Sequence, residues 1–117
     1  MSQSRLNLIA IALPLIAAPA LGAEKATQFW NLTSSTVTKL EISKAGANAF
    51  GPNQTINDPD GTVDHDERLK IVGVGEGVFD VRLTLKDGRV CLVKGLTIRK
   101  GKPFSIEDKN LVDCAKV

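Results

Sequence analysis

Five carboxylates lie within the eleven residues from Asn57 to Glu67, which read NDPDGTVDHDE. Carboxylate and carbonyl oxygens at alternate positions of a tight loop can point at one centre, and hard cations such as calcium prefer oxygen ligands. The stretch also suits a solvated turn, because Asp-Pro-Asp-Gly is typical of turns. Like charges at this density repel one another unless a cation or basic neighbours such as Arg68 and Lys70 offset them. The sequence therefore predicts either a cation site or an acidic turn.

Around Gly61 this stretch resembles an EF-hand calcium loop, which has oxygen ligands at positions 1, 3, 5, 7, 9 and 12 and a glycine at position 6. The resemblance implies a site for calcium or a similar hard cation. Its implied ligands are Asp58, Asp60, the Thr62 carbonyl, Asp64 and Glu67. Position 1 is Ile56, which has no side-chain oxygen, and no amphipathic helix precedes the loop. The resemblance therefore covers the loop and not the EF-hand fold.

Few other residues suggest catalysis. His65 is the only histidine, and its place in a polar loop predicts a solvated side chain. Any catalytic group that pairs histidine with serine or cysteine would depend on this one residue. Carboxylate pairs such as Asp64 with Glu67 or Asp80 have no spacing that singles them out as a hydrolase pair. We therefore expect that the protein is not an enzyme.

Phe29 and Trp30 are adjacent aromatic residues in a predicted strand. Successive side chains of a strand point to opposite faces, so one ring is expected in the core and the other outside. The outward ring either offers a contact platform for a partner or a sugar, or is covered by the loop that contains Phe50.

Alternating apolar residues and β-branched residues predict about seven short strands after the first 26 residues. The predicted strands are 27–33, 36–43, 68–74, 78–85, 90–95, 96–99 and 104–107. A long polar connection runs from Lys44 to about Asp66, and the stretch from Asp108 to Cys114 is expected as a turn or a short helical stub. Short strands separated by frequent turn signals predict an all-β fold, either a small antiparallel β-sandwich or a partly open barrel.

The clearest hairpin signal is VFDVRLTLKDGRVCLV, residues 78–93. Its Asp-Gly pair suits a tight type I′ turn, whose two central positions favour positive φ. The register decides whether Val90 and Leu92 or Cys91 and Val93 join the buried face. A glycine bulge would select the second pair. The sequence leaves both registers open.

The first 23 residues have the layout of a secretory signal peptide. Arg5 precedes an apolar run that ends near Leu21, and cleavage is expected after Gly22 or Ala23. A membrane anchor is the alternative, but the run contains two prolines and is shorter than the roughly 20 apolar residues of a spanning helix. We therefore expect 1–23 to be a signal peptide and 24–117 to form a single β-rich domain. We expect that this domain does not span a membrane and that it is periplasmic or secreted.

Cys91 and Cys114 are the only cysteines. An exported chain meets an oxidising compartment, in which such a pair normally closes. Two free thiols or a metal pair are the alternatives, but a zinc site would have too few ligands with a single histidine in the chain. We predict a Cys91–Cys114 disulfide, which would stabilise the fold by about 3 kcal/mol through chain entropy.

The charges nearly balance, since 15 basic and 13 acidic residues give a net charge of +2. This balance does not indicate a nucleic-acid partner, and no basic face with interleaved aromatic residues supports base stacking. The expected function is binding of a protein or a small ligand through the loop segment 45–67, because loops on a rigid sheet often carry function. Calcium binding by the acidic loop is the alternative.

The runs FWNLTSSTVTKLEIS, FGPN and FDVRLTLKDGRVC, followed by a final cysteine, resemble small exported bacterial proteins known only as an uncharacterised family. The resemblance implies a compact periplasmic β-sandwich. It implies no activity, ligand or partner.

Overall fold

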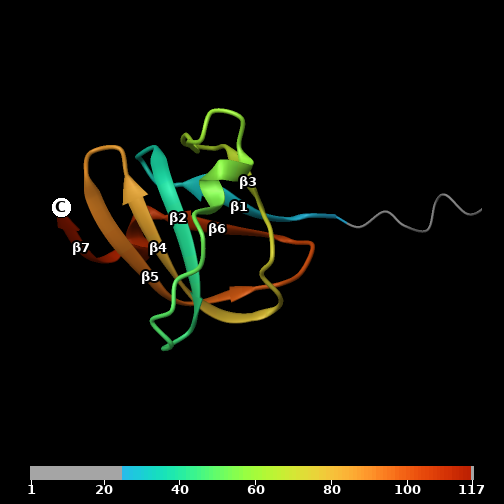
Figure 1. Ribbon diagram of the computed structural model, residues 1–117. Coiled ribbons are helices and arrows are strands. Elements are labelled where there is room, and N and C mark those ends of the chain that lie inside the picture. Colours follow the sequence, from blue (N-terminus) through green and yellow to red (C-terminus); the bar gives the residue numbers. More distant parts are fainter. Residues whose placement is uncertain (1–24, 117) are drawn as a thin grey trace, which may run out of the picture.

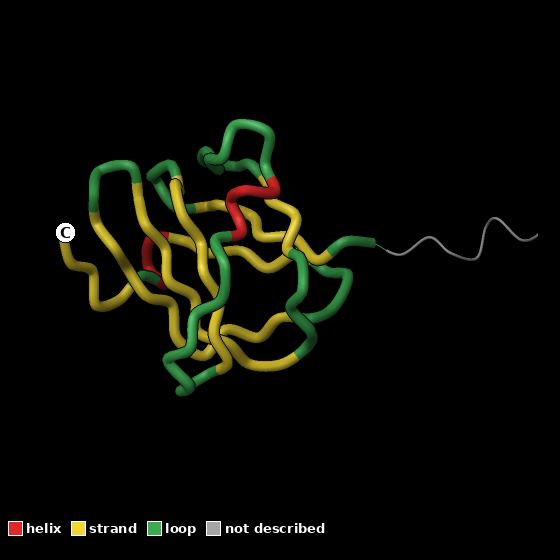
Figure 2. The backbone as a smooth tube through the Cα atoms, viewed as in Figure 1, coloured by secondary structure: helices red, strands yellow, loops and turns green. Residues whose placement is uncertain are grey.

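The computed structural model describes residues 25–116, and the predicted signal peptide lies outside the described residues. The strands form two sheets that pack face to face (Figure 1). One sheet has three strands in the order β3 (Arg68–Ile71), β1 (Thr27–Leu32) and β6 (Pro103–Glu107). The other has four strands in the order β2 (Val37–Lys44), β4 (Gly77–Leu85), β5 (Arg89–Ile98) and β7 (Val112–Lys116). Two short 3-10 helices are η3 (Gln54–Asn57) and η4 (Asp108–Asn110) (Figure 2).

The predicted small all-β fold with one disulfide is confirmed, and its architecture is a sandwich. Most strand pairs are antiparallel, but β1 and β6 are parallel, with Phe29 opposite Phe104. The short connection after β1 carries the chain from the three-stranded sheet to the four-stranded sheet. The first two predicted strands are therefore neighbours in sequence but belong to different sheets.

The hydrophobic core fills the space between the sheets. Phe29 from the three-stranded sheet and Leu40 and Leu83 from the four-stranded sheet are fully buried. The rings of Phe29 and Phe104 have centroids 5.8 Å apart. The buried apolar residues form one cluster, which is Phe29, Val37, Leu40, Ile42, Val63, Leu69, Ile71, Phe79, Val81, Leu83, Leu85, Cys91, Val93, Ile98, Phe104 and Ile106.

The β4–β5 hairpin turns through a glycine bulge. Gly88 has a φ of 95°, and its N–H donates to the Leu85 carbonyl at 2.9 Å, while Asp87 keeps a negative φ. The predicted type I′ turn is therefore wrong, because that turn needs positive φ at both central residues. The bulge selects the register that buries Cys91 and Val93.

Strand β5 runs without a break from Arg89 to Ile98, so the two strands predicted over 90–99 are one. Its pairing with β4 shifts register between Phe79 and Val81. Gly95 has a φ of 69° at this bulge, and its N–H donates to Asp80 Oδ1 at 3.0 Å. Asp80 Oδ2 accepts the N–H of Gly46 at 2.9 Å. The Asp80 carboxylate thus holds the bulge to the turn that follows β2.

Helix η3 closes the gap between β2 and β3, the outer strands of the two sheets on one side (Figure 1). The Asn53 side chain caps η3 and also accepts the Leu40 N–H of β2 at 3.0 Å. On the other side, the Gln54 amide donates to the Val72 carbonyl at 2.9 Å and accepts the Val72 N–H at 3.0 Å. Side-chain amides therefore satisfy backbone groups at two sheet edges, which protects those edges from pairing with another strand.

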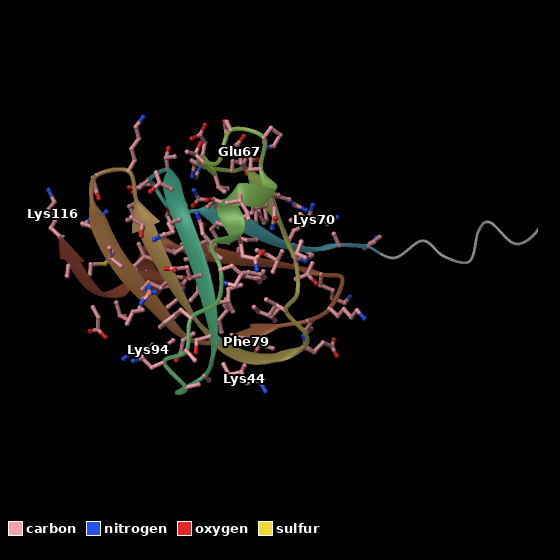
Figure 3. All side chains as sticks on the ribbon, in the orientation of Figure 1. Lys44, Glu67, Lys70, Phe79, Lys94 and Lys116 are labelled. Carbon is pink, nitrogen blue, oxygen red and sulfur yellow. A yellow bond between two sulfur atoms is a disulfide. The ribbon has the colours of Figure 1, made fainter. Side chains whose placement is uncertain are left out.

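Strand β7 is held to β5 by the disulfide. All five of its residues are exposed, so β7 buries no apolar side chain. Cys114 of β7 is bonded to Cys91, which is fully buried on β5, and the bond lies between the two strands in Figure 3. The predicted turn or stub at this end is correct for η4 alone, because the following residues are paired as a strand.

Candidate functional site

The acidic loop connects η3 to β3 at one end of the sandwich (Figure 1). Asp58 Oδ2 accepts the N–H of Asp60 at 3.2 Å. Asp60 Oδ1 accepts the N–H and the hydroxyl of Thr62 at 3.0 and 3.1 Å. These are the contacts of Asx turns, and the positive φ of Gly61 permits the sharp bend. The first three implied calcium ligands therefore build the turn itself.

The later acidic residues tie the loop to the sheets. Glu67 Oε1 accepts the N–H of Asp64 at 2.7 Å. Asp64 Oδ1 accepts the Thr36 hydroxyl at 2.9 Å, and Asp66 Oδ1 accepts the Trp30 indole N–H at 2.9 Å. These three carboxylates thus accept hydrogen bonds that fix the path of the loop.

Asp58 and Asp60 are close enough to alter each other's protonation. The hydrogen bond between their side chains raises the pKa of Asp58 and lowers the pKa of Asp60, and repulsion from Glu67 adds to the rise at Asp58. Within residues 25–116, no group of three or more His, Cys, Asp or Glu side chains is placed to hold one metal ion. The five implied ligands follow one hydrogen-bonded loop, and calcium binding by them stays a prediction.

His65 is exposed, and its Nδ1 lies 2.8 Å from the Thr33 carbonyl. With the proton on Nδ1, the ring donates to this carbonyl and fastens the loop to the end of β1. The Asp80 carboxylate accepts backbone N–H groups beside the β5 bulge, the Asp64 carboxylate accepts the Thr36 hydroxyl, and the Glu67 carboxylate accepts the Asp64 N–H. Asp80 is therefore apart from the loop, and the Asp64–Glu67 contact runs from the Asp64 backbone N–H to the Glu67 carboxylate rather than between two carboxyl groups.

Phe29 and Trp30 point to opposite faces of β1, as predicted. Phe29 is fully buried, and Trp30 is partly exposed on the outer face of the three-stranded sheet. The Arg68 guanidinium lies over the indole, 4.6 Å from the ring centroid, and Asp66 accepts the indole N–H. Phe50 instead packs against an arginine of β4. The outward ring is therefore covered by Arg68 and oriented by Asp66.

A cleft of about 460 Å³ opens on the side where η3 closes the sandwich, between the end of β2 and the segment that joins β3 to β4. Its floor is apolar, because Ile42 and Phe79 are 7% and 8% exposed there and Val74 packs against the core. Figure 3 shows Phe79 beside Lys44 at the end of the molecule opposite Glu67. The cleft therefore reaches the edge of the hydrophobic core.

Glycines, which have no side chain to fill the space, form part of the cleft wall. Gly51, Gly73 and Gly75 line it, and the charged side chains of Lys44 and Glu76 lie at its rim. No hydrogen bond within residues 25–116 uses the backbone N–H of Gly73 or Gly75, and both residues are exposed. The sequence reasoning missed this cleft, although VGVGEG between two strands was a visible signal for an open backbone.

No protein-family model, curated protein or solved structure matches the chain. Among residues 25–116, no helix has the length and apolar character needed to cross a membrane. The fold and the cleft together define a small disulfide-bonded β-sandwich with a partly apolar cleft beside one sheet edge.

Proposed function

We propose that the protein is an exported, non-enzymatic binding domain that takes a small ligand, or one side chain of a partner, in the cleft between β2 and the 73–76 segment. The observation that carries this proposal is the apolar floor of Ile42 and Phe79 under glycine walls. Ligand sites are commonly clefts of a few hundred Å³ with apolar linings and a small number of polar groups. The disulfide is compatible with the periplasm or the extracellular space, where such bonds persist.

The chemistry of the cleft defines the ligand class. The apolar floor favours a hydrocarbon or aromatic group, and the N–H groups of Gly73 and Gly75 favour a carbonyl or carboxylate next to that group. Lys44 and Glu76 at the rim add one charge of each sign. An amphipathic molecule with an apolar body and a polar end fits these features best.

A cleft-filling substitution tests the proposal. Gly75 lines the cleft, has no positive φ, and a Cβ added there meets no atom within 4 Å, so Gly75→Trp is expected to fold and to place a bulky ring at the cleft wall. The probe is anilinonaphthalene sulfonate, an amphipathic dye, followed by amide shifts in a nitrogen-15 NMR titration. Saturable shifts at Gly73, Gly75 and Phe79 that Gly75→Trp removes and the control Gly75→Ala keeps would support the proposal. Shifts scattered over the surface, or unchanged binding by Gly75→Trp, would refute it.

Calcium binding by the acidic loop is the second candidate. The observation that favours it is the repulsion that Asp60 and Glu67 exert on Asp58, because a bound cation would relieve it. The test is calorimetric titration with calcium of the disulfide-intact protein and of Asp60→Asn combined with Glu67→Gln. One-to-one binding that the double variant loses would establish a site, and Glu107→Gln is the matched control. Absence of heat and of any melting shift at millimolar calcium would leave the loop as a turn.

A further inference from the structure

The outer face of the three-stranded sheet carries a cationic group that is held in place. Trp30 of β1 lies opposite Arg68 of β3, and Gln28 lies opposite Lys70. These four side chains point away from the core, because the alternate residues of both strands are buried. The face is therefore lined by one aromatic ring, one amide and two cations.

Two residues, Asp66 and Trp30, act in turn to orient the Arg68 side chain. Asp66 Oδ1 accepts the Trp30 indole N–H at 2.9 Å, which fixes the ring plane. Trp30 in turn holds the Arg68 guanidinium over its face at 4.6 Å. An arginine stacked on an aromatic ring keeps its N–H donors free at the edge of the guanidinium plane. Arg68 is thus oriented by its neighbours without using its hydrogen-bond donors on them.

Arg68 is in no ion pair within residues 25–116. The ion pairs there join Arg82 to Glu41, Arg89 to Asp87 and Lys94 to Asp113. None of the side-chain hydrogen bonds of the described residues uses Arg68 as a donor, although its neighbour Glu67 ends the acidic loop.

Arg68 lines a surface hollow together with Lys25 and Gln28. The hollow has a volume of about 310 Å³, and Gly101 and Pro103 complete its wall. A second hollow of about 380 Å³ shares Lys25 and Gly101 and adds Lys100 and Glu76. Glu76 Oε2 accepts the backbone N–H of Lys100 at 3.1 Å. Most of the charged side chains around the joined hollows are therefore cations.

Further cations extend this region. Lys70 lies beside Gln28 on the sheet, and Lys102 follows the Lys100–Gly101 turn. Figure 3 places Lys70 on the side where β1 begins, away from Lys116 on the opposite side. No ion pair within the described residues involves Lys25, Arg68, Lys70, Lys100 or Lys102. We call these five residues the basic face.

We propose that the basic face binds an acidic polysaccharide, with a sulfate or carboxylate group held in the hollow between Arg68 and Lys25. The guanidinium matches such an oxyanion with two parallel N–H bonds, and Lys25 adds a point charge. The polar sheet face suits a glycan chain better than a peptide with apolar anchors, because Gln28 and Ser105 face outward there and can bond to sugar hydroxyls. This site is separate from the cleft in composition and in ligand chemistry.

The test uses dextran sulfate as the probe and the disulfide-intact protein. Trp30 is the only tryptophan, so its fluorescence reports directly on the proposed site. We expect saturable binding that weakens with added salt, as screening of charges requires. Unmodified dextran is expected to give no change. Binding of unmodified dextran with equal strength, or no binding of dextran sulfate at low salt, would overturn the proposal.

Matched variants assign the binding to particular residues. Loss of one charge-assisted contact predicts that Arg68→Gln weakens binding roughly tenfold or more, whereas the control Lys116→Gln changes it less than about twofold. Trp30→Phe keeps a ring under Arg68 but loses the bond to Asp66, so calorimetry should give an intermediate affinity. Equal losses in Arg68→Gln and Lys116→Gln would show attraction to net charge alone and would refute the site. Equally tight binding of poly-glutamate would refute the preference for a glycan.

Discussion

Replacing Asn31 by alanine is expected to lower the free energy of unfolding by about 3 kcal/mol. Asn31 is fully buried, and its amide donates to the Ser35 and Val63 carbonyls at 2.9 and 2.8 Å. Its Oδ1 accepts the Thr33 N–H at 3.0 Å and the Thr33 hydroxyl at 2.7 Å. The side chain therefore joins β1, the β1–β2 connection and the acidic loop.

The magnitude follows from which groups lose every partner. After the substitution the Val63 carbonyl still accepts the Val37 N–H, and the Ser35 carbonyl accepts the Thr33 hydroxyl, whose single proton no longer goes to Asn31. Only the buried Thr33 N–H is left without an acceptor, which costs roughly 2 kcal/mol, and the other lost bonds add about 1 kcal/mol. Typical domains have only about 5–15 kcal/mol of stability, so this is a large fraction.

Urea unfolding followed by Trp30 fluorescence measures this effect. Lys86→Ala is the control, because the Lys86 side chain is exposed and makes no hydrogen bond or ion pair within residues 25–116, so its loss should cost less than about 1 kcal/mol. Asn31→Asp should be more destabilising at pH 7 than at pH 4. Burial and the two facing carbonyls raise the pKa of the introduced carboxyl in the folded state, so folding is penalised above the unfolded-state pKa. A loss below about 1 kcal/mol in Asn31→Ala would refute the reasoning.

Two further predictions concern the four-stranded sheet. Replacing Cys91 and Cys114 together by alanine should lower the free energy of unfolding by about 3 kcal/mol, because the bond closes a loop of sequence separation 23; equal urea midpoints with and without the substitutions would contradict this. The N–H groups of Gly46 and Gly95 lower the pKa of Asp80 below its ordinary value of 3.8. A lowered folded-state pKa stabilises above the unfolded-state value, and this stability is lost as the pH falls through the folded-state pKa. Melting temperatures should therefore fall less steeply below about pH 4 for Asp80→Asn than for the wild type, and parallel pH profiles would rule out this role.

The local parts of the fold could be predicted because their signals lie within one or two strands. The alternation from Phe79 to Leu85 fixes which face of β4 is buried, and the Asp-Gly pair locates the hairpin. The cysteine pair also follows from the sequence, since only two cysteines are present. What the alternation does not specify is the φ of Asp87, which decides between two turns with different registers.

The non-local parts were missed for a physical reason. The polar residues from Asn53 to Asn57 look like a loop, yet their amides bond to backbone groups of two separate strands. Gly95 looks like a strand end, but Asp80 stabilises a bulge there and β5 continues. The cleft and the basic face likewise bring together segments that are distant in sequence. Residue types and the periodicity of apolar residues predict local structure, but they do not predict contacts between segments that are distant in sequence.

The hydrogen-bond partners of the acidic-loop carboxylates could not be predicted for the same reason. The residue types of the acidic loop predict cation ligands, but they do not predict that these carboxylates also accept hydrogen bonds from the backbone and from β1. Asp66 illustrates the point, because its partner Trp30 is 36 residues away. A donor so distant in sequence gives no local signal that the carboxylate is already bonded.

The hydrogen bonds between the η3 segment and the edges of both sheets limit where residues can be inserted into this chain. An insertion between Asn53 and Asn57 would displace amides that serve both sheets at once, so even one added residue should disturb two layers. The tip of the acidic loop at Pro59 and Asp60 is exposed and makes its hydrogen bonds within the loop. Exposed tips of this kind tolerate inserted segments. The chain therefore offers a graft point for a foreign peptide only a few residues from a segment whose length is fixed.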